Sequence, residues 1–420
     1  MKRITTYVLL LLIAAAASGK DWPSWRGPGN LGVADGAEYP ESWDVEKDTL
    51  WSTELPGTST STPIVWGDRL FLTSQIGRSP IARRGEGEDP EADDALTFVV
   101  LALDRATGRE VWRRDVPSAG ELPATHLKHN LASPSPVTDG DRLITWFATG
   151  QVVAFDLDGK ELWQRNLAED FGPFDIRWAH GSSPVLHEDK VFLLCEHNTA
   201  YLLALDAATG ETAWRVERES PGRSYTTPLL VERDGRPELI VNATQNLQAY
   251  DPATGDELWR VGQPIRVPVS TPVFADGVLY TSRGYRSGPY MAVDLDGAKG
   301  DISETHTLWR VATGAPYVSS LLHYNGIVFM ATEAGVASAI DATSGKTLWR
   351  ERLGGNFSAS PVAADGKVYL ANEEGEFFVI AADKEYRLIS QTSLDEGLQA
   401  TPALVEGRIY LRSAAKLYAF

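Results

Sequence analysis

Side chains suited to binding a small molecule gather in short segments, each directly before a Ser-Pro, Thr-Pro or related pair. Histidine, arginine and amide groups mixed with aromatic rings suit a polar or anionic small molecule, a sugar or an extended peptide. In a second interpretation, the same side chains fill a channel and hydrogen-bond one another. Besides His126 and Lys128, the candidate ligand-binding residues are His129, Asn130, Trp178, His180, Arg223, Tyr225, Arg266, Tyr317, Asn356 and Gln399.

No catalytic group is assigned among these residues, because the sequence has no G-x-S-x-G, phosphate-loop, H-E-x-x-H or dinucleotide-binding pattern. No metal ligand is assigned either. Cys195 is the only cysteine, which excludes an intrachain disulfide and a cysteine-based zinc or haem site. The run VFLLCEH around Cys195 predicts a buried strand thiol.

The elements that must position these side chains follow from two repeated features. The first is a Ser/Thr-Pro pair followed by apolar residues, which recurs mostly every 40 to 49 residues, with Ser320-Leu321 in the one slot that lacks proline. The second is a tryptophan late in each unit. These tryptophans are Trp51, Trp112, Trp163, Trp214, Trp259, Trp309 and Trp349, and the pattern decays near 388–389.

Each unit is typical of four short strands rich in Val, Ile, Leu, Tyr and Phe and separated by Gly, Asp and Asn turns. One unit, for example, has strands A to D near 182–189, 190–197, 200–208 and 211–218. Four-stranded units with this period predict an all-β, eight-bladed β-propeller. The C-terminal unit supplies only strands A to C, so residues 48–55 are predicted to close the last blade as its outer strand.

The phrase DPATGDELWR at 251–260, repeated with variations, joins strand C to strand D in this scheme. Asp and Gly suit the turn, and the tryptophan ring can pack against the neighbouring blade. The tryptophans are therefore interpreted as blade-docking residues. Strand C-to-D and A-to-B turns share one face of a propeller, whereas the candidate binding residues lie in D-to-A connections on the other face, which they share with the B-to-C loops.

The repeats and the N-terminal DWPSWRGPGNLGV resemble the pyrroloquinoline-quinone-like (PQQ-like) propeller repeat family across residues 21–420. The resemblance implies either a ligand- or protein-binding scaffold that acts through its axial face, or an oxidoreductase of alcohols or sugars that uses PQQ with calcium. We expect the first, without a cofactor. Asp175 is the only carboxylate of the axial segments, and Glu196 offers one further calcium ligand, whereas Ca²⁺ needs several oxygen ligands.

Charge and terminal patterns set further expectations. The net charge of −18 argues against nucleic acid and anionic lipid as partners. Residues 1–19 have the pattern of a secretory signal, and no cysteine follows them to carry a lipid. We therefore expect an exported periplasmic or extracellular protein without a membrane anchor. We also expect a monomer that binds an unknown protein or a polar small molecule.

The predicted domains are a signal peptide at 1–19, an N-terminal extension at 20–47 and one propeller at 48–420. An insertion at about 75–96 carries an acidic run expected to form a solvated loop on the axial face. The stretch DLDGAKGDISE at 294–304 superficially resembles a calcium loop, but its glycine is misplaced for that pattern, so a long C-to-D turn is expected.

Overall fold

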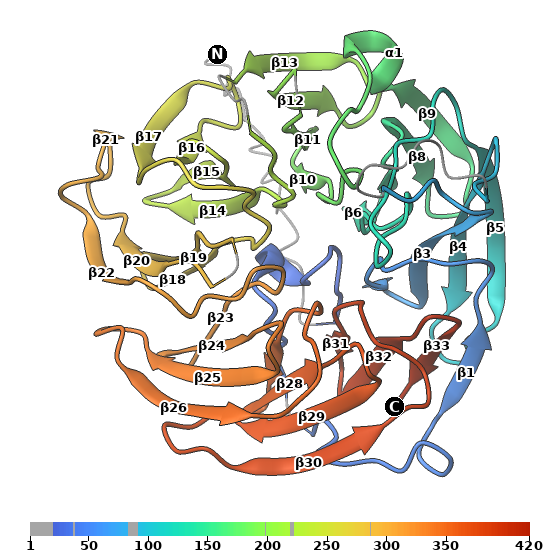
Figure 1. Cartoon of the computed structure of the whole chain (residues 1–420). Helices are drawn as coiled ribbons and strands as arrows, with labels where there is room; N and C mark the ends of the chain where they lie inside the picture. The colour runs from blue at the N-terminus through green and yellow to red at the C-terminus, as the bar shows by residue number, and fades with distance from the viewer. Residues whose placement is uncertain (1–19, 37, 83–90, 198, 219–221, 286) are drawn as a thin grey trace, which may run out of the picture.

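Eight antiparallel four-stranded units arranged in a ring form the molecule, as predicted (Figure 1). The computed structural model describes residues 20–36, 38–82, 91–197, 199–218, 222–285 and 287–420. The proposed signal peptide and most of the acidic run at 85–94 lie outside these ranges. Within the described ranges, no helix has the length and apolar character needed to cross a lipid bilayer.

The first four blades run from the innermost strand outward in chain order. Blade 1 contains β2 (Ile64–Trp66), β3 (Arg69–Ile76), β4 (Thr97–Asp104) and β5 (Glu110–Pro117). Blade 2 contains β6 (Val137–Thr138), β7 (Arg142–Trp146), β8 (Gln151–Asp156) and β9 (Glu161–Asn166). Blade 3 contains β10 (Val185–His187), β11 (Lys190–Cys195), β12 (Tyr201–Asp206) and β13 (Thr212–Glu217). Blade 4 contains β14 (Leu229–Arg233), β15 (Arg236–Asn242), β16 (Leu247–Tyr250) and β17 (Glu257–Val261).

The remaining blades follow the same order. Blade 5 contains β18 (Val273–Ala275), β19 (Val278–Ser282), β20 (Tyr290–Asp294) and β22 (Thr307–Val311). Blade 6 contains β23 (Leu322–Tyr324), β24 (Ile327–Ala331), β25 (Val336–Asp341) and β26 (Thr347–Arg352). Blade 7 contains β27 (Val362–Ala364), β28 (Lys367–Ala371), β29 (Glu376–Ala381) and β30 (Leu388–Ser393). Blade 8 contains β31 (Ala403–Val405), β32 (Arg408–Arg412), β33 (Lys416–Ala419) and β1 (Trp51–Glu54). The helices of the described ranges are the short α1 (Leu167–Phe171) and η1 (Pro28–Asn30).

The two middle strands of each blade are buried on both faces, because a neighbouring blade covers each side. Every residue of β28 is buried, whereas the outer strand β26 buries only its tryptophan completely. This explains the apolar runs of the middle strands, since burial on both faces removes the alternation expected of a half-exposed strand. Cys195 ends β11 as a buried thiol, and burial raises its pKa to about 12.

The last blade is closed by the N-terminal outer strand, as the sequence predicted. Strand β1 pairs antiparallel with β33, with Trp51 opposite Ala419 and Glu54 opposite Lys416. Figure 1 shows the blue β1 beside the red β33. Strands from the N-terminal and C-terminal parts of the chain thus share one sheet, and blade 8 has four strands like the others.

The residues of the repeated Ser/Thr-Pro position connect the blades around the channel. At seven junctions, the backbone N–H of one such residue donates to the hydroxyl of the corresponding residue in the next blade, over 2.9–3.1 Å. The chain of donors and acceptors runs Thr62, Ser135, Ser183, Thr227, Thr271, Ser320, Ser360 and Thr401. We call these eight residues the hydroxyl ring. Ser320 takes part without a following proline, so the hydroxyl is the common requirement.

The repeated tryptophans also reach across the blade junctions. Six of the seven donate their indole N–H to a carbonyl in the C-to-D turn of the next blade, as Trp163 Nε1 does to Ala207 O over 2.9 Å. The turn glycine is needed under the ring: a Cβ atom at Gly345, whose φ is +71°, would lie 2.7 Å from Trp309. The exception is Trp259, whose Nε1 donates to Glu238 Oε2 of its own blade over 2.8 Å.

Residues 295–306 account for this exception. The sequence predicted a long turn here, but the segment also contains β21 (Gly300–Asp301), which pairs in parallel with β17 and adds a fifth strand to blade 4. Ala298 and Ile302 belong to the same apolar cluster as Trp259, which is fully buried. Residues 295–306 therefore cover Trp259, which lacks the hydrogen bond to a C-to-D turn that the other six tryptophans make.

The N-terminal segment 21–34 runs across the centre of the ring, where Figure 1 shows it in blue. Trp22 pairs with Val65 of β2, and Ala34 N donates to Ala363 O of β27 over 2.9 Å. Between them, the buried Arg26 donates to Leu321 O over 2.9 Å. The sequence predicts residues 20–47 only as an extension, and in the structure its segment 21–34 crosses the centre of the ring.

We expect Trp259→Ala to lower the free energy of unfolding by about 3–5 kcal/mol, because it removes a fully buried ring and leaves a cavity. Denaturant unfolding followed by circular dichroism would measure this change. Leu308→Ala is the control, since Leu308 precedes Trp309 on an outer strand but is 51% exposed. Equal stability losses in the two variants would argue against a structural role for the buried Trp259 ring.

Candidate functional site

A cavity of about 490 Å³ lies on the axis, on the face of the D-to-A connections. All eight of these connections contribute lining residues, from Thr60 before blade 1 to Gln399 before blade 8. Four hydroxyl-ring residues, Ser135, Ser183, Thr227 and Thr401, also line it, and so does Trp25 of the N-terminal segment. The segments that differ between repeats therefore surround one shared space, which we call the axial cavity.

Aromatic side chains form much of its wall. Trp178, Tyr225, Tyr285 and Tyr317 join Trp25 in the lining. Tyr285 and Tyr317 meet edge to face, with ring centroids 5.1 Å apart. Tyr225 donates its hydroxyl proton to Arg177 O, and the Arg177 guanidinium lies 4.8 Å from the Trp178 ring centroid. These contacts fix the rings in place before any ligand enters, which reduces the entropy that binding must overcome.

Trp178 has an unusual backbone conformation. Its φ is +74°, and that of the following Ala179 is +60°, a region that residues other than glycine seldom adopt. A parallel bridge joins Trp178 to Thr125, and a second joins Thr125 to Ile81 of the blade-1 insertion. Because such strain persists only where surrounding structure enforces it, these bridges hold Trp178 in the cavity wall.

The charged groups of the cavity are already engaged. Lys128 forms an ion pair with Glu373, and Ser358 donates its hydroxyl proton to the same carboxylate. Glu333 Oε1 accepts the backbone N–H groups of Tyr317 and Val318 over 2.7 and 2.6 Å. Both carboxylates thus hold neighbouring cavity segments in position.

Two histidines lie at the wall: the half-buried His129 lines the cavity, and His180 is buried behind it. His129 Nε2 lies 3.2 Å from His180 O, and the His180 ring packs against Trp146 with centroids 3.7 Å apart. Burial lowers the pKa of His129 to about 4 and that of His180 well below its usual value. Both rings are therefore neutral at pH 7 in the folded protein.

Six of the ten candidate binding residues line the axial cavity: His129, Trp178, Tyr225, Tyr317, Asn356 and Gln399. The other four lie outside its lining. Asn130 Oδ1 accepts Ala132 N over 3.0 Å, and His180 is buried behind the wall. Arg223 is exposed, and the exposed Arg266 places its guanidinium 5.5 Å from the centroid of Tyr285, a lining residue. His126 and Lys128 belong to the lining.

Sequence reasoning missed lining residues of two kinds. Tyr285, Glu333 and Glu373 come from B-to-C loops, and Trp25 comes from the N-terminal segment. The topology of a propeller places the B-to-C loops on the axial face, so residues of these loops could have been included among the candidates. Asp175, the one carboxylate noted in the D-to-A segments, is not among the lining residues, whereas Glu333 and Glu373 of the B-to-C loops are.

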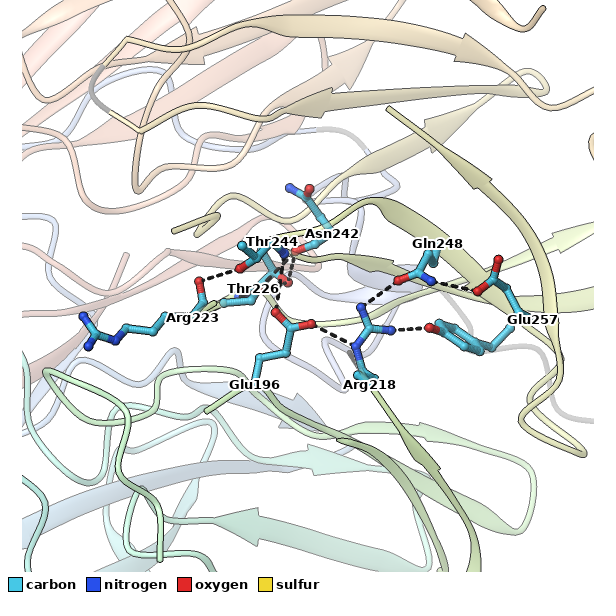
Figure 2. A network of polar contacts seen from close by, with 10 residues as sticks. Glu196, Arg218, Arg223, Thr226, Asn242, Thr244, Gln248 and Glu257 are labelled. Carbon is cyan, nitrogen blue, oxygen red and sulfur yellow. Dashed lines mark hydrogen bonds and ion pairs between the residues drawn. The ribbon is translucent and has the colours of Figure 1, made fainter. Parts of the chain in front are cut away.

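Glu196, considered as a calcium ligand for the enzyme alternative, belongs instead to a buried polar network between blades 3 and 4 (Figure 2). Its Oε1 lies 2.9 Å from Arg218 Nε, and both side chains are almost completely buried. Arg218 also donates to Tyr250 and Gln248, and Gln248 donates to Glu257. This carboxylate is used for contact between blades, outside the axial cavity.

Comparison with known families identifies the fold relationship. The model of the family described as outer membrane protein assembly factor BamB, a PQQ-like repeat family, matches residues 33–192, 97–299, 243–354 and 333–420. The chain belongs to this family. Two curated members of the wider group are similar over shorter stretches. A polyvinylalcohol dehydrogenase of a Pseudomonas species is 27% identical over 39% of this chain, and a quinohemoprotein alcohol dehydrogenase of Pseudomonas putida is 28% identical over 28%. The aligned stretches span only 24% and 17% of those relatives.

Solved structures show the same PQQ-like propeller fold at low identity. The quinohemoprotein alcohol dehydrogenase of Comamonas testosteroni superposes with a TM-score of 0.70 at 14% identity, covering 96% of this chain and 81% of that one. BamB of Moraxella catarrhalis gives a TM-score of 0.59 at 16% identity, covering 88% and 96%. These similarities establish the fold, and the function must be argued from the site.

We expect the free energy of unfolding to fall as the pH is lowered from 7 to 5. Between the folded pKa of His129, about 4, and its ordinary value of 6.5, the unfolded chain binds more protons, so stability is lost on acidification. The loss should be roughly 1–2 kcal/mol for each such histidine. Urea unfolding at several pH values would measure it. His129→Gln should flatten the dependence, whereas the control His306→Gln should not; an unchanged slope in His129→Gln would contradict this account.

Proposed function

We propose that this chain is an exported binding module whose axial cavity holds a polar small molecule or an extended segment of a partner protein. The observation that carries the proposal is the composition of the cavity: all eight non-repeating D-to-A connections meet around it. A fold needs only the repeated residues to assemble its blades. Side chains that vary from blade to blade and still converge on one cavity are free to serve recognition.

The cavity wall suits a ligand with flat faces and hydrogen-bonding edges. Trp178, Tyr225 and Tyr317 offer ring surface, and Asn356 and Gln399 add amide groups. A volume of about 490 Å³ lies within the usual range for small-molecule sites. A sugar, a polar or anionic small molecule and a peptide segment all fit this description.

Sequence pattern, family membership and charge support the proposed cellular location and partners. The N-terminal sequence pattern supports export to the periplasm or beyond, and membership of the BamB family supports protein binding as one use of the axial face. The net charge of −18 disfavours nucleic acid and anionic lipid surfaces.

A second candidate function is oxidation of an alcohol or sugar with PQQ and calcium, favoured by the similarity to alcohol dehydrogenases. The cavity residues do not fit the metal. Ca²⁺ takes six to eight oxygen ligands, whereas Glu373 is bound to Lys128 and Ser358, and Glu333 holds two backbone N–H groups. No cluster of three potential metal ligands occurs within the described residues. We therefore assign no redox step to this chain.

The binding proposal is tested with the fluorescent dye 8-anilinonaphthalene-1-sulfonate, an aromatic anion whose emission rises in apolar sites. We expect the dye to bind saturably. Among added sugars, carboxylates and peptides, the class that contains the true ligand should displace the dye. The double variant Trp178→Ala/Tyr317→Ala should bind the dye about tenfold more weakly. Tyr324→Ala is the control, since Tyr324 ends an inner strand and does not line the cavity. Undiminished dye binding in the double variant would place the site elsewhere.

The enzyme alternative is tested by adding PQQ and Ca²⁺ to the purified chain and measuring dye-linked oxidation of alcohols and sugars. We expect no turnover, because the cavity carboxylates are held by other groups. Saturable, PQQ-dependent turnover that is lost in Trp178→Ala/Tyr317→Ala would overturn the binding proposal in favour of the oxidoreductase.

A further inference from the structure

A second, smaller cavity of about 170 Å³ adjoins the axial cavity at the junction of blades 8 and 1. Glu373 and Gln399 line both, so the two spaces share a wall. The remaining lining residues are Ser59, Gly397, Ala400, Arg412, Ser413 and Ala414. We call this space the side cavity.

Arg412 is the only basic residue among those that line the side cavity, and its side chain is 1% exposed. Its Nη1 donates to Ser61 O, Ser61 Oγ and Thr73 O, and its Nη2 donates to Ser74 Oγ over 2.8 Å. All these partners are uncharged. The Nε–H is buried and has no partner within the described residues.

This arrangement leaves a positive charge buried without a negative one. Arg218, by comparison, is equally buried but pairs with Glu196. Burial alone accounts for the lowering of the Arg412 pKa to about 9, with no carboxylate acting against it. Glu373 shares the side cavity, yet its ion pair is with Lys128. An uncompensated buried charge is costly, and an anion beside it removes much of that cost.

Arg26 is also buried without a carboxylate, but it lines neither cavity. Arg412 differs because it lines the side cavity, which shares two lining residues with the axial cavity. A guanidinium recognises a carboxylate through charge-assisted hydrogen bonds, and its rigid planar shape favours that group.

We infer that the side cavity is a carboxylate subsite, in which Arg412 binds a carboxylate carried by the ligand of the axial cavity. The inference rests on the proposed binding function and narrows it to ligands that carry a carboxylate, whether on a small organic acid, an acidic sugar or the end of a peptide. Such a group would lie beside Gln399 and Arg412, which both line the side cavity.

Acetate is the probe and acetamide, its uncharged isostere, is the matched control. At constant ionic strength we expect acetate to raise the Tm of the chain in a saturable way and acetamide to leave it unchanged, because only the anion compensates Arg412. Equal effects of the two compounds, or no saturable shift with acetate, would overturn the assignment.

Variants locate the acetate site. Ala414→Leu fills the side cavity from an exposed position and should weaken acetate binding about tenfold, whereas Ala415→Leu, the exposed neighbour outside the lining, should not. Arg412→Gln keeps amide donors without the charge and should abolish the acetate effect in calorimetric titration. Acetate binding that survives in Ala414→Leu or Arg412→Gln would exclude this subsite.

The same titration separates this inference from the proposed function. If Trp178→Ala/Tyr317→Ala loses dye binding but its Tm still rises with acetate, the result supports both the axial site and the carboxylate subsite, acting independently. Dye binding that is unaffected by these substitutions overturns the axial site alone, since acetate still reports on Arg412.

Discussion

Hydrogen bonds between successive hydroxyl-ring residues are the contact on which the rest of the ring depends. Each joins the backbone of one innermost strand to the side chain of the next, where the blades come closest together. One such bond contributes only about 0.5–1.5 kcal/mol. Seven in sequence, all buried, fix the spacing of the strand starts around the channel. The residues immediately before them are then held at the axis whatever their type.

The eighth junction, between blades 8 and 1, is built differently. Thr62 Oγ1 has no hydrogen-bond partner within the described residues, and no bond from Thr401 reaches it. Arg412 crosses the junction instead and donates to Ser61, Thr73 and Ser74. On the same junction the outer strand comes from the other end of the chain. The side cavity therefore lies where the hydroxyl ring is interrupted, and a charged residue replaces a neutral contact there.

The repeats explain why the sequence predicted eight blades and the closing strand correctly. Each blade carries the same signals, so one weak unit, such as the segment near Leu388, is supported by seven others. Structural features that occur only once in the chain could not be recognised from a repeated pattern. Strand β21 arises from a single insertion, and the N-terminal segment crosses the ring through contacts with blades far away in sequence. Neither leaves a periodic pattern, so only the three-dimensional structure reveals them.

The site was predictable to the extent that topology places a residue near the axis, but side-chain direction decides which residue reaches the cavity. His129 and Trp178 line it, whereas Asn130 and His180, one and two positions further along the chain, turn into the protein. The positive φ angles at Trp178 and Ala179 produce one of these reversals. The same geometry bears on chemistry. A calcium ion needs several oxygen ligands, and here the carboxylates of Glu333 and Glu373 hold the loops that form the wall. The groups that make the cavity rigid are thus engaged in structural contacts, which supports the proposal that the remaining side chains serve recognition.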